Sequence, residues 1–277
     1  AILAQFEAVT ITHLQKSRAD YGKIRLWGSL GFIATVAGLG VLFDWIAISW
    51  LPVTLLLCAF VAAVISFIIP APPLQPSHTL KNPLLDTLKQ SKVWRFLVVH
   101  FLLQLSQAPY YSFFSVYLEE KGYSRTIIGF LWSLGVLAEV VAFTQTHRLL
   151  HKFSEYNLIQ WCLFLAAIRW FAIAWAVDIP SILCTVQLLH AFSFAVFHAA
   201  AMQFIFREFE PQQQGQGQAF YSALWGLGVA IGSWLTGMVW LSWGANVIFS
   251  VAALCCVAAM LIIKDSNVKV CNTLVHK

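Results

Sequence analysis

The sequence predicts an all-α integral membrane protein built as a bundle of transmembrane helices. Of its 277 residues, 60% are apolar or aromatic and only 10% are charged, whereas a soluble domain carries about 25% charged residues. The apolar residues form charge-free runs of about 18 or more, the length that crosses a hydrocarbon core. Lysine and arginine gather in alternate loops between these runs, as the positive-inside rule expects.

The apolar runs predict eight complete transmembrane helices. Runs this long suit helices, because barrel strands need about ten residues with strict alternation, and this sequence does not alternate. The last run is long enough for two helices, with Trp243, Gly244 and Asn246 at the turn between them. The runs cover residues 26–43, 45–69, 96–118, 126–147, 156–177, 179–206 and 219–263.

The basic residues predict which side of the membrane each loop faces. One set of loops, with the C-terminus, carries most of them and is therefore expected to be cytoplasmic. The alternate loops carry only Lys121 and Arg125. The net charge of +5 is then explained by topology, so the lipid bilayer is an expected partner and nucleic acid is not.

A proline-rich polar stretch divides the spans into two groups. We expect residues 1–69 to belong to an N-terminal bundle, 70–92 to form a cytoplasmic central loop, 93–264 to form a C-terminal six-helix bundle and 265–277 to form a cytoplasmic tail. Residues 1–11 are apolar but cover only about 17 Å of helix. They are expected to be the end of a ninth span, in which the chain begins.

Two charged residues, Glu139 and Arg169, fall inside predicted spans. A charge at mid-membrane costs at least about 2.5 to 3.5 kcal/mol on insertion scales, so each is a candidate functional group. They form either one buried pair that joins neighbouring helices or part of a hydrated cavity in which Glu139 exchanges a proton.

Histidines supply further candidates. His190 and His198 lie eight residues apart in one span, within about 80° on a regular helix. Each is either a proton carrier or a hydrogen-bonding neighbour. No metal or cofactor is expected, because this spacing is not i, i+4 and the six cysteines form no ligand motif. His147 and His151 have that spacing, but they lie among basic residues at a cytoplasmic end and are interpreted as solvated.

A polar stripe marks one further helix, and small residues mark two others. His100, Gln104, Gln107 and Tyr111 recur at steps of four, three and four, which places them on one helix face. This face either packs on a partner helix or lines a solute path, and its polarity favours the path. Close helix packing is expected at small residues, namely Gly28, Gly31, Gly38, Gly40, Gly226, Gly228, Gly232 and Gly237.

Several segments resemble the major facilitator superfamily. The segment YGKIRLWGSLGF at 21–32 is similar to the cytoplasmic end of its fifth helix. Closer similarity, to the 3-phenylpropionate (hydrocinnamate) permease group related to lactose permease, is carried by WRFL at 94–97, FLWSLGVLAEV at 130–140, IRW at 168–170 and QLLHAFSFAVFHAAAMQFI at 187–205. The resemblance covers essentially the whole chain. It implies the end of helix 4, helices 5 and 6, and a complete C-terminal bundle.

The resemblance also implies roles for individual residues. Glu7 and Arg25 are 18 residues apart, like the sugar-binding carboxylate and arginine of lactose permease, and Arg169 and His190 match positions in its ninth and tenth helices. Ser193 replaces its tenth-helix carboxylate, and its eighth-helix acid is shifted by about one turn, to Glu139. The predicted substrate-binding residues are Glu7, Arg25, Gln104, Gln107, Tyr111 and Arg169. The predicted proton-coupling residues are Glu139, His190 and His198.

The implied function is proton-coupled uptake of a small aromatic carboxylate such as 3-phenylpropionate by a multi-pass monomer of the bacterial inner membrane. Arg25 or Arg169 would pair with the carboxylate while an aromatic side chain packs on the ring. The alternative cargo is a sugar or nucleoside, which Glu7 and the glutamines suit. A second alternative is that this chain alone transports nothing, because part of one bundle lies outside it. No enzyme is expected, because no nucleophile or metal cluster gathers at one depth.

Overall fold

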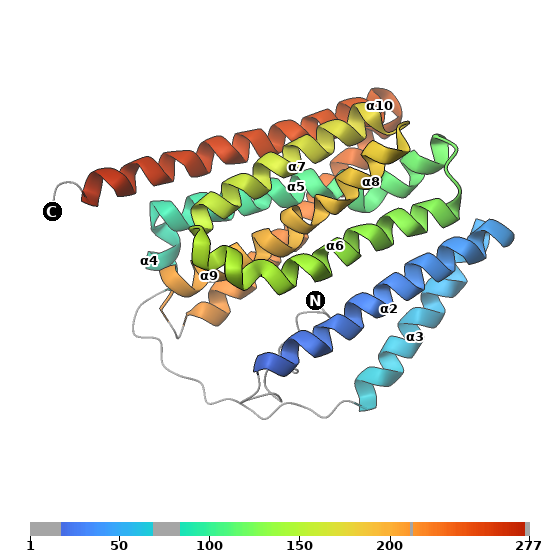
Figure 1. Cartoon of the computed structure of the whole chain (residues 1–277), viewed down its shortest axis with the longest axis horizontal. Coiled ribbons are helices and arrows are strands. Elements are labelled where there is room, and N and C mark those ends of the chain that lie inside the picture. Colours follow the sequence, from blue (N-terminus) through green and yellow to red (C-terminus); the bar gives the residue numbers. More distant parts are fainter. Residues whose placement is uncertain (1–17, 69–83, 211–212, 275–277) are drawn as a thin grey trace. The chain divides into compact units, whose positions relative to one another are not determined.

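The computed structural model describes residues 18–68, 84–210 and 213–274, with side chains for 27–68, 84–210 and 213–263. Within these ranges every regular element is a helix (Figure 1). The chain divides into two compact units, one of residues 1–78 and 124–133 and one of residues 79–123 and 134–277. The predicted end of a ninth span, and most of the predicted central loop, lie outside the described residues.

The first unit contains α2 (Arg18–Trp45), the short η1 (Ile48–Trp50), α3 (Leu51–Ile68) and the first turns of α6 (Arg125–Lys152). The chain reverses at η1, and Pro52 stands in the first turn of α3, where its missing N–H costs nothing. α3 buries no side chain, and Phe67 is 92% exposed. Such an apolar outer surface is suited to lipid rather than to water.

In the first unit α2 meets the start of α6 through backbone contacts and one carboxylate. A Cβ added at Gly40 would lie 2.7 Å from the carbonyl oxygen of Arg125, and one added at Gly129 would lie 2.8 Å from that of Val36. Asp44 then accepts hydrogen bonds from the backbone N–H groups of Arg125 and Thr126, at 2.9 and 3.0 Å. The end of α2 therefore caps the exposed N–H groups that begin α6.

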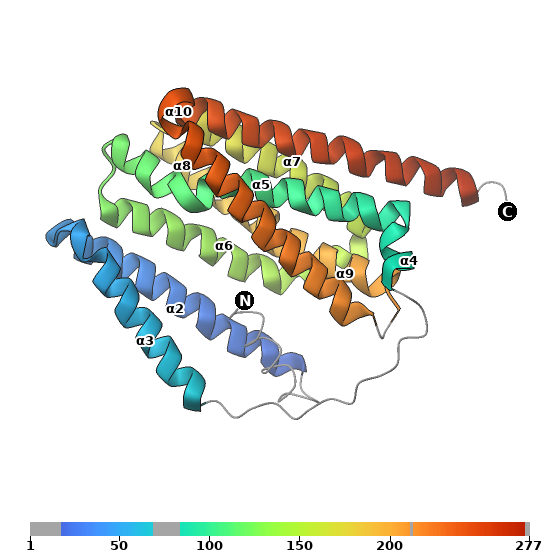
Figure 2. The ribbon, with the colours of Figure 1, turned by 180° about the vertical axis from the view of Figure 1, so that it is seen from behind.

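The second unit is built around α5 (Ser91–Glu120) and α10 (Gln214–Leu274), which pack on each other, with α7 (Glu155–Ala176) packed on α10. Figure 2 shows α10 turning back along the bundle. Its two halves meet at Gly244, which has φ 73° and ψ 160°, a conformation that glycine adopts without strain. The predicted turn at this position is confirmed.

The remaining elements of the second unit are α4 (Leu84–Lys89), the rest of α6, α8 (Pro180–Leu188), the π-helical η2 (Phe192–Val196) and α9 (Phe197–Glu208). α8, η2 and α9 together occupy the predicted span 179–206. The π segment lies between His190 and His198, so the angle calculated for them from 3.6 residues per turn does not apply. π segments inside helices occur frequently at functional sites.

The structure shows close packing at several of the predicted glycines. A Cβ at Gly228 would lie 2.7 Å from Cβ of Gln104, and one at Gly232 would lie 2.4 Å from Cβ of Ala108. This small-xxx-small step lets α10 approach α5 closely, as predicted. For Gly28, Gly31, Gly38 and Gly226 a Cβ would meet nothing within 4 Å among the described residues, so close packing at these four positions stays a prediction.

Six helical segments in the described part of the chain are long and apolar enough to cross a membrane. They run over Trp27–Trp45, Ile48–Ile68, Arg125–Lys152, Glu155–Ala176, Pro180–Glu208 and Gln214–Ile263. The all-helical membrane class is therefore confirmed at this level. The finer count of eight complete spans and the end of a ninth stays a prediction.

Candidate functional site

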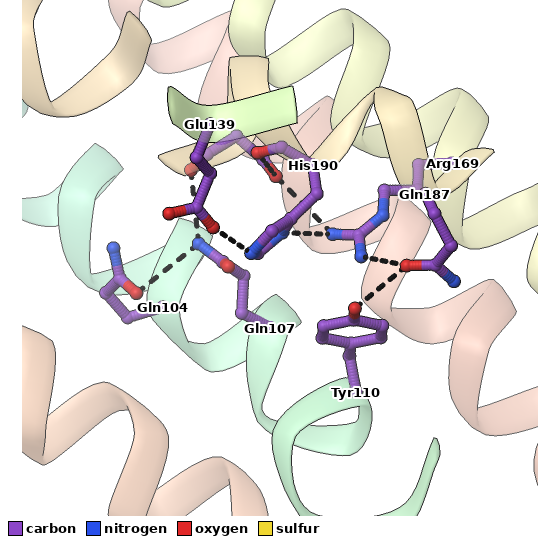
Figure 3. A network of polar contacts seen from close by, with 8 residues as sticks. Gln104, Gln107, Tyr110, Glu139, Arg169, Gln187 and His190 are labelled. Atoms are coloured by element: carbon purple, nitrogen blue, oxygen red, sulfur yellow. Dashed lines mark hydrogen bonds and ion pairs between the residues drawn. The ribbon is translucent and has the colours of Figure 1, made fainter. Parts of the chain in front are cut away.

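Buried polar side chains from several elements of the second unit form one connected network (Figure 3). α6 contributes Glu139, α7 contributes Arg169, and the α8 to η2 segment contributes Gln187, His190 and Ser193; α5 contributes Gln104, Gln107 and Tyr110. Glu139, the most exposed of these side chains, is only 9% exposed. Polar groups this deep are expected to be paired, and the network supplies most of the partners.

His190 joins the two intramembrane charges. Its Nε2 lies 2.6 Å from Oε1 of Glu139, and its Nδ1 lies 2.9 Å from NH1 of Arg169. A guanidinium only donates, so Nδ1 must accept and the ring proton must sit on Nε2, from which it donates to Glu139. The hydrogen-bond pattern therefore assigns a neutral His190 that bridges an anion and a cation.

Arg169 is completely buried and is held on several sides. Its guanidinium carbon lies 4.1 Å from the ring centre of Tyr110 and 4.5 Å from that of Trp170, which are cation–π distances. Its NH2 donates to Oε1 of Gln187 at 3.3 Å, and Tyr110 donates to the same oxygen at 2.8 Å. In this arrangement a ligand reaches Arg169 only if one of these groups moves.

The polar stripe of α5 forms a ladder that continues the network. His100 Nε2 lies 3.0 Å from the Tyr221 carbonyl oxygen, which leaves Nδ1 to accept from Gln104 at 3.5 Å. Gln107 donates to Oε1 of Gln104 at 3.4 Å and to the carbonyl oxygen of Ser193 at 3.3 Å. In this arrangement His100, Gln104 and Gln107 pack against α10 and η2.

Tyr111 and His198 lie at the margin of this network. Tyr111 is half-buried, with its ring 6.3 Å from that of His190 and 6.5 Å from that of Trp225. His198 Nδ1 lies 3.2 Å from the hydroxyl of Tyr221. The structure thus pairs Glu139 with His190 and pairs His198 with Tyr221. The ring of Tyr221 also stacks on that of His100, with ring centres 3.9 Å apart.

The structure does not describe the side chains of two predicted substrate-binding residues, Glu7 and Arg25. Glu7 lies outside the described residues, and Arg25 lies in α2 but its side chain is not among those described. Their substrate-binding roles stay predictions. Gln187 and Tyr110, which sequence reasoning missed, are central to the observed network. Gln187 is a neutral residue near the end of α8, and no local pattern in the sequence indicated it.

Three buried polar atoms at the network lack a hydrogen-bond partner among the described residues: Nε of Arg169, Nε2 of Gln187 and Oε1 of Gln107. Two are donors, so the site retains capacity for an acceptor such as water or an anion. Within the same part of the chain no three histidine, cysteine, aspartate or glutamate residues gather closely enough to hold a metal ion. The side chains of the network can hydrogen-bond, form ion pairs and exchange protons.

Comparison with known proteins places the chain in a family. The family model described as the MFS_1 like family matches residues 1–251. The "Probable 3-phenylpropionic acid transporter" of Escherichia coli (strain K12) is 32% identical over 271 residues, which cover 92% of this chain and 68% of that protein.

Two further relatives are more distant. The maltose permease of Geobacillus stearothermophilus is 26% identical over 269 residues, covering 95% of this chain and 67% of the permease. The uncharacterized transporter YwbF of Bacillus subtilis (strain 168) is 22% identical over 238 residues, covering 84% and 58%. These relatives are transporters and not enzymes. With charged residues buried among membrane-length helices, the chain is a multi-pass membrane transporter, and it belongs to the MFS_1 like family of the major facilitator superfamily, in the 3-phenylpropionate permease group.

Proposed function

We propose that this chain takes part in proton-coupled uptake of a small aromatic carboxylate, such as 3-phenylpropionate, across the bacterial inner membrane. The observation that carries the proposal is the neutral imidazole of His190 between Glu139 and Arg169. A buried carboxylate linked to a buried cation through a titratable ring is a natural proton site. The name of the Escherichia coli relative supports the cargo.

Protonation of Glu139 would switch the network between two arrangements. The ionised carboxylate accepts the Nε2 proton of His190. Once Glu139 is neutral it no longer balances the charge of Arg169, and its hydrogen bond to the ring weakens. Arg169 then needs another anion, and a substrate carboxylate supplies one. Proton and anionic substrate would therefore bind together, because the proton removes the negative charge of Glu139 and the substrate carboxylate replaces it beside Arg169.

The substrate carboxylate would use the two donors that have no protein partner among the described residues, Nε of Arg169 and Nε2 of Gln187. A charge-assisted hydrogen bond to arginine is about twice as strong as a neutral one. Tyr110 covers Arg169, so binding requires this ring to move. The half-buried Tyr111 then offers a face for the substrate ring.

A sugar is the second candidate cargo, since the maltose permease matches almost the full chain. Gln104 and Gln107 would then serve as hydroxyl partners, as their position in a polar stripe suggests. In either case we propose eight complete spans. α5 would add one span to the six candidates, and the halves of α10 would count as two. The 1–69 and 93–264 groups would form two bundles with a cytoplasmic C-terminus.

The test is uptake of labelled 3-phenylpropionate and labelled maltose by cells or vesicles that carry the full-length protein. We expect accumulation of the carboxylate that depends on an inward proton gradient. Glu139→Gln should abolish gradient-driven accumulation while leaving exchange of internal for external substrate, whereas Glu119→Gln, at the exposed end of α5, should leave both unchanged. Accumulation by Glu139→Gln at the wild-type level would remove the proton-site assignment, and maltose uptake alone would select the second cargo.

A further inference from the structure

A second histidine cluster lies at the C-terminal end of α6, apart from the network around His190. His147 Nε2 and His151 Nε2 are 3.1 Å apart. Their ring centres are 4.3 Å apart, with ring planes at 74°, and both side chains are exposed. Residues at i and i+4 share a helix face, but this alone does not make two nitrogen atoms converge. Here they do.

The distance between the two nitrogens matches what a metal ion requires. Imidazole nitrogen binds Zn²⁺ at about 2.0–2.1 Å, so two such ligands are about 3.3 Å apart in tetrahedral geometry and about 2.9 Å apart at a right angle. The observed separation lies between these values. An ion could therefore bind with little change of either side chain.

The two neighbouring cations engage other groups. Arg148 donates to Oε1 of Gln145 at 3.0 Å, and Lys152 Nζ lies 5.5 Å from the ring centre of Phe153. Their charges weaken the attraction for a cation, but exposure to water screens this effect. The sequence interpretation of His147 and His151 as merely solvated basic residues does not account for the convergence of their nitrogens.

We propose that His147 and His151 form a two-ligand site for a divalent transition-metal ion. In the free protein one Nε2–H donates to the other nitrogen; in the bound protein both Nε2 lone pairs face the ion and both ring protons sit on Nδ1. No third histidine, cysteine, aspartate or glutamate joins them within the described residues. Water fills the other positions, which makes the ion exchangeable, and Cu²⁺ binds more tightly than Ni²⁺ or Zn²⁺.

Metal binding would stabilise the last turns of α6. The ion connects two side chains one turn apart, so it opposes fraying at the helix end, where four carbonyl groups lack intrahelical partners. This site is independent of the transport proposal, because neither histidine belongs to the polar network.

The test is electron paramagnetic resonance of the purified full-length protein, produced without a histidine tag, after addition of one equivalent of Cu²⁺. We expect hyperfine splitting from two imidazole nitrogens. His147→Asn and His151→Asn should each remove the two-nitrogen signal, and the double variant should lose tight binding in calorimetry. Arg148→Gln is the matched control, since it changes the neighbouring charge but keeps both rings.

The result that overturns the proposal is a two-nitrogen signal that persists in the double variant, because the ion would then bind other histidines. Absence of stoichiometric Cu²⁺ binding to the wild-type protein would overturn it equally. If the double variant does not fold, the single variants supply the test. Each of them keeps one imidazole, so its spectrum should show splitting from one nitrogen instead of two.

Discussion

The contact between α2 and the start of α6 and the network around His190 join helices in opposite ways. The first relies on glycine positions where backbones approach closely, with the exposed Asp44 as a cap. The second relies on long side chains that are almost fully buried and bridge a charge pair. The first contact should therefore be sensitive to side-chain volume and the second to charge. Substitutions in the two regions can therefore separate the effect of volume from the effect of charge.

The largest expected effect comes from removing the buried cation. Arg169→Met keeps an unbranched apolar stem but removes the guanidinium whose charge compensates Glu139, so we expect a loss of about 3 to 5 kcal/mol in stability. Unfolding in detergent can be followed by reaction of a thiol dye with the buried Cys162, after the other cysteines are replaced.

The matched control for this variant is Glu139→Gln combined with Arg169→Met. Removing both charges should recover part of the lost stability, because no unpaired buried charge remains. If Arg169→Met alone unfolds at the wild-type midpoint, the Glu139–His190–Arg169 bridge does not stabilise the second unit.

The next effect comes from volume in the first unit. Gly40→Val places a Cβ 2.7 Å from the carbonyl oxygen of Arg125, and overpacking of this kind costs about 1 to 3 kcal/mol. Gly38→Val is the matched control on the same helix, since a Cβ there meets nothing within 4 Å. Hydrogen exchange should show α2 and the first turn of α6 losing protection in the first variant only. Equal losses in both would mean that helix propensity, not contact, decides the result.

The sequence predicted the parts of the fold and site that depend on local pattern. Apolar runs indicated the helices, and glycine at position 244 indicated the turn that the structure confirms. A charge within an apolar run is conspicuous, so Glu139 and Arg169 could be singled out before their neighbours were known.

Features that depend on partners far along the chain were missed. Gln187 is a neutral residue in a long apolar segment, and its importance arises only because Arg169 and Tyr110 meet it from α7 and α5. The π segment at Phe192–Val196 changes the helix register, which no count at 3.6 residues per turn reveals. The cap at Asp44 joins residues more than 80 positions apart, so local spacing gives no sign of it.

A smaller effect is expected from one neutral hydrogen bond of the network. Tyr110→Phe removes the 2.8 Å bond to Gln187 and should cost about 0.5 to 1.5 kcal/mol in the thiol-dye assay. Tyr123→Phe is the control, because it removes a bond of 2.7 Å to the Val177 carbonyl outside the network. Both should lose similar stability, but only Tyr110→Phe should change substrate uptake. A similar change of uptake in both would indicate a general packing effect.

The smallest effect is expected from charge in the first unit. Asp44→Asn removes the charge and one of the two acceptor oxygens, because Oδ1 accepts from the amide of Arg125 and Oδ2 from that of Thr126. Asparagine caps helices about as well as aspartate, so we expect the thermal midpoint to fall only slightly and one of these two amides to exchange faster, whereas Asp44→Ala should expose both amides to exchange. Hydrogen exchange resolved at these two residues is the measurement. A large loss of stability in Asp44→Asn would show that this contact, like the network around His190, depends on charge, and the contrast between the two regions would fail.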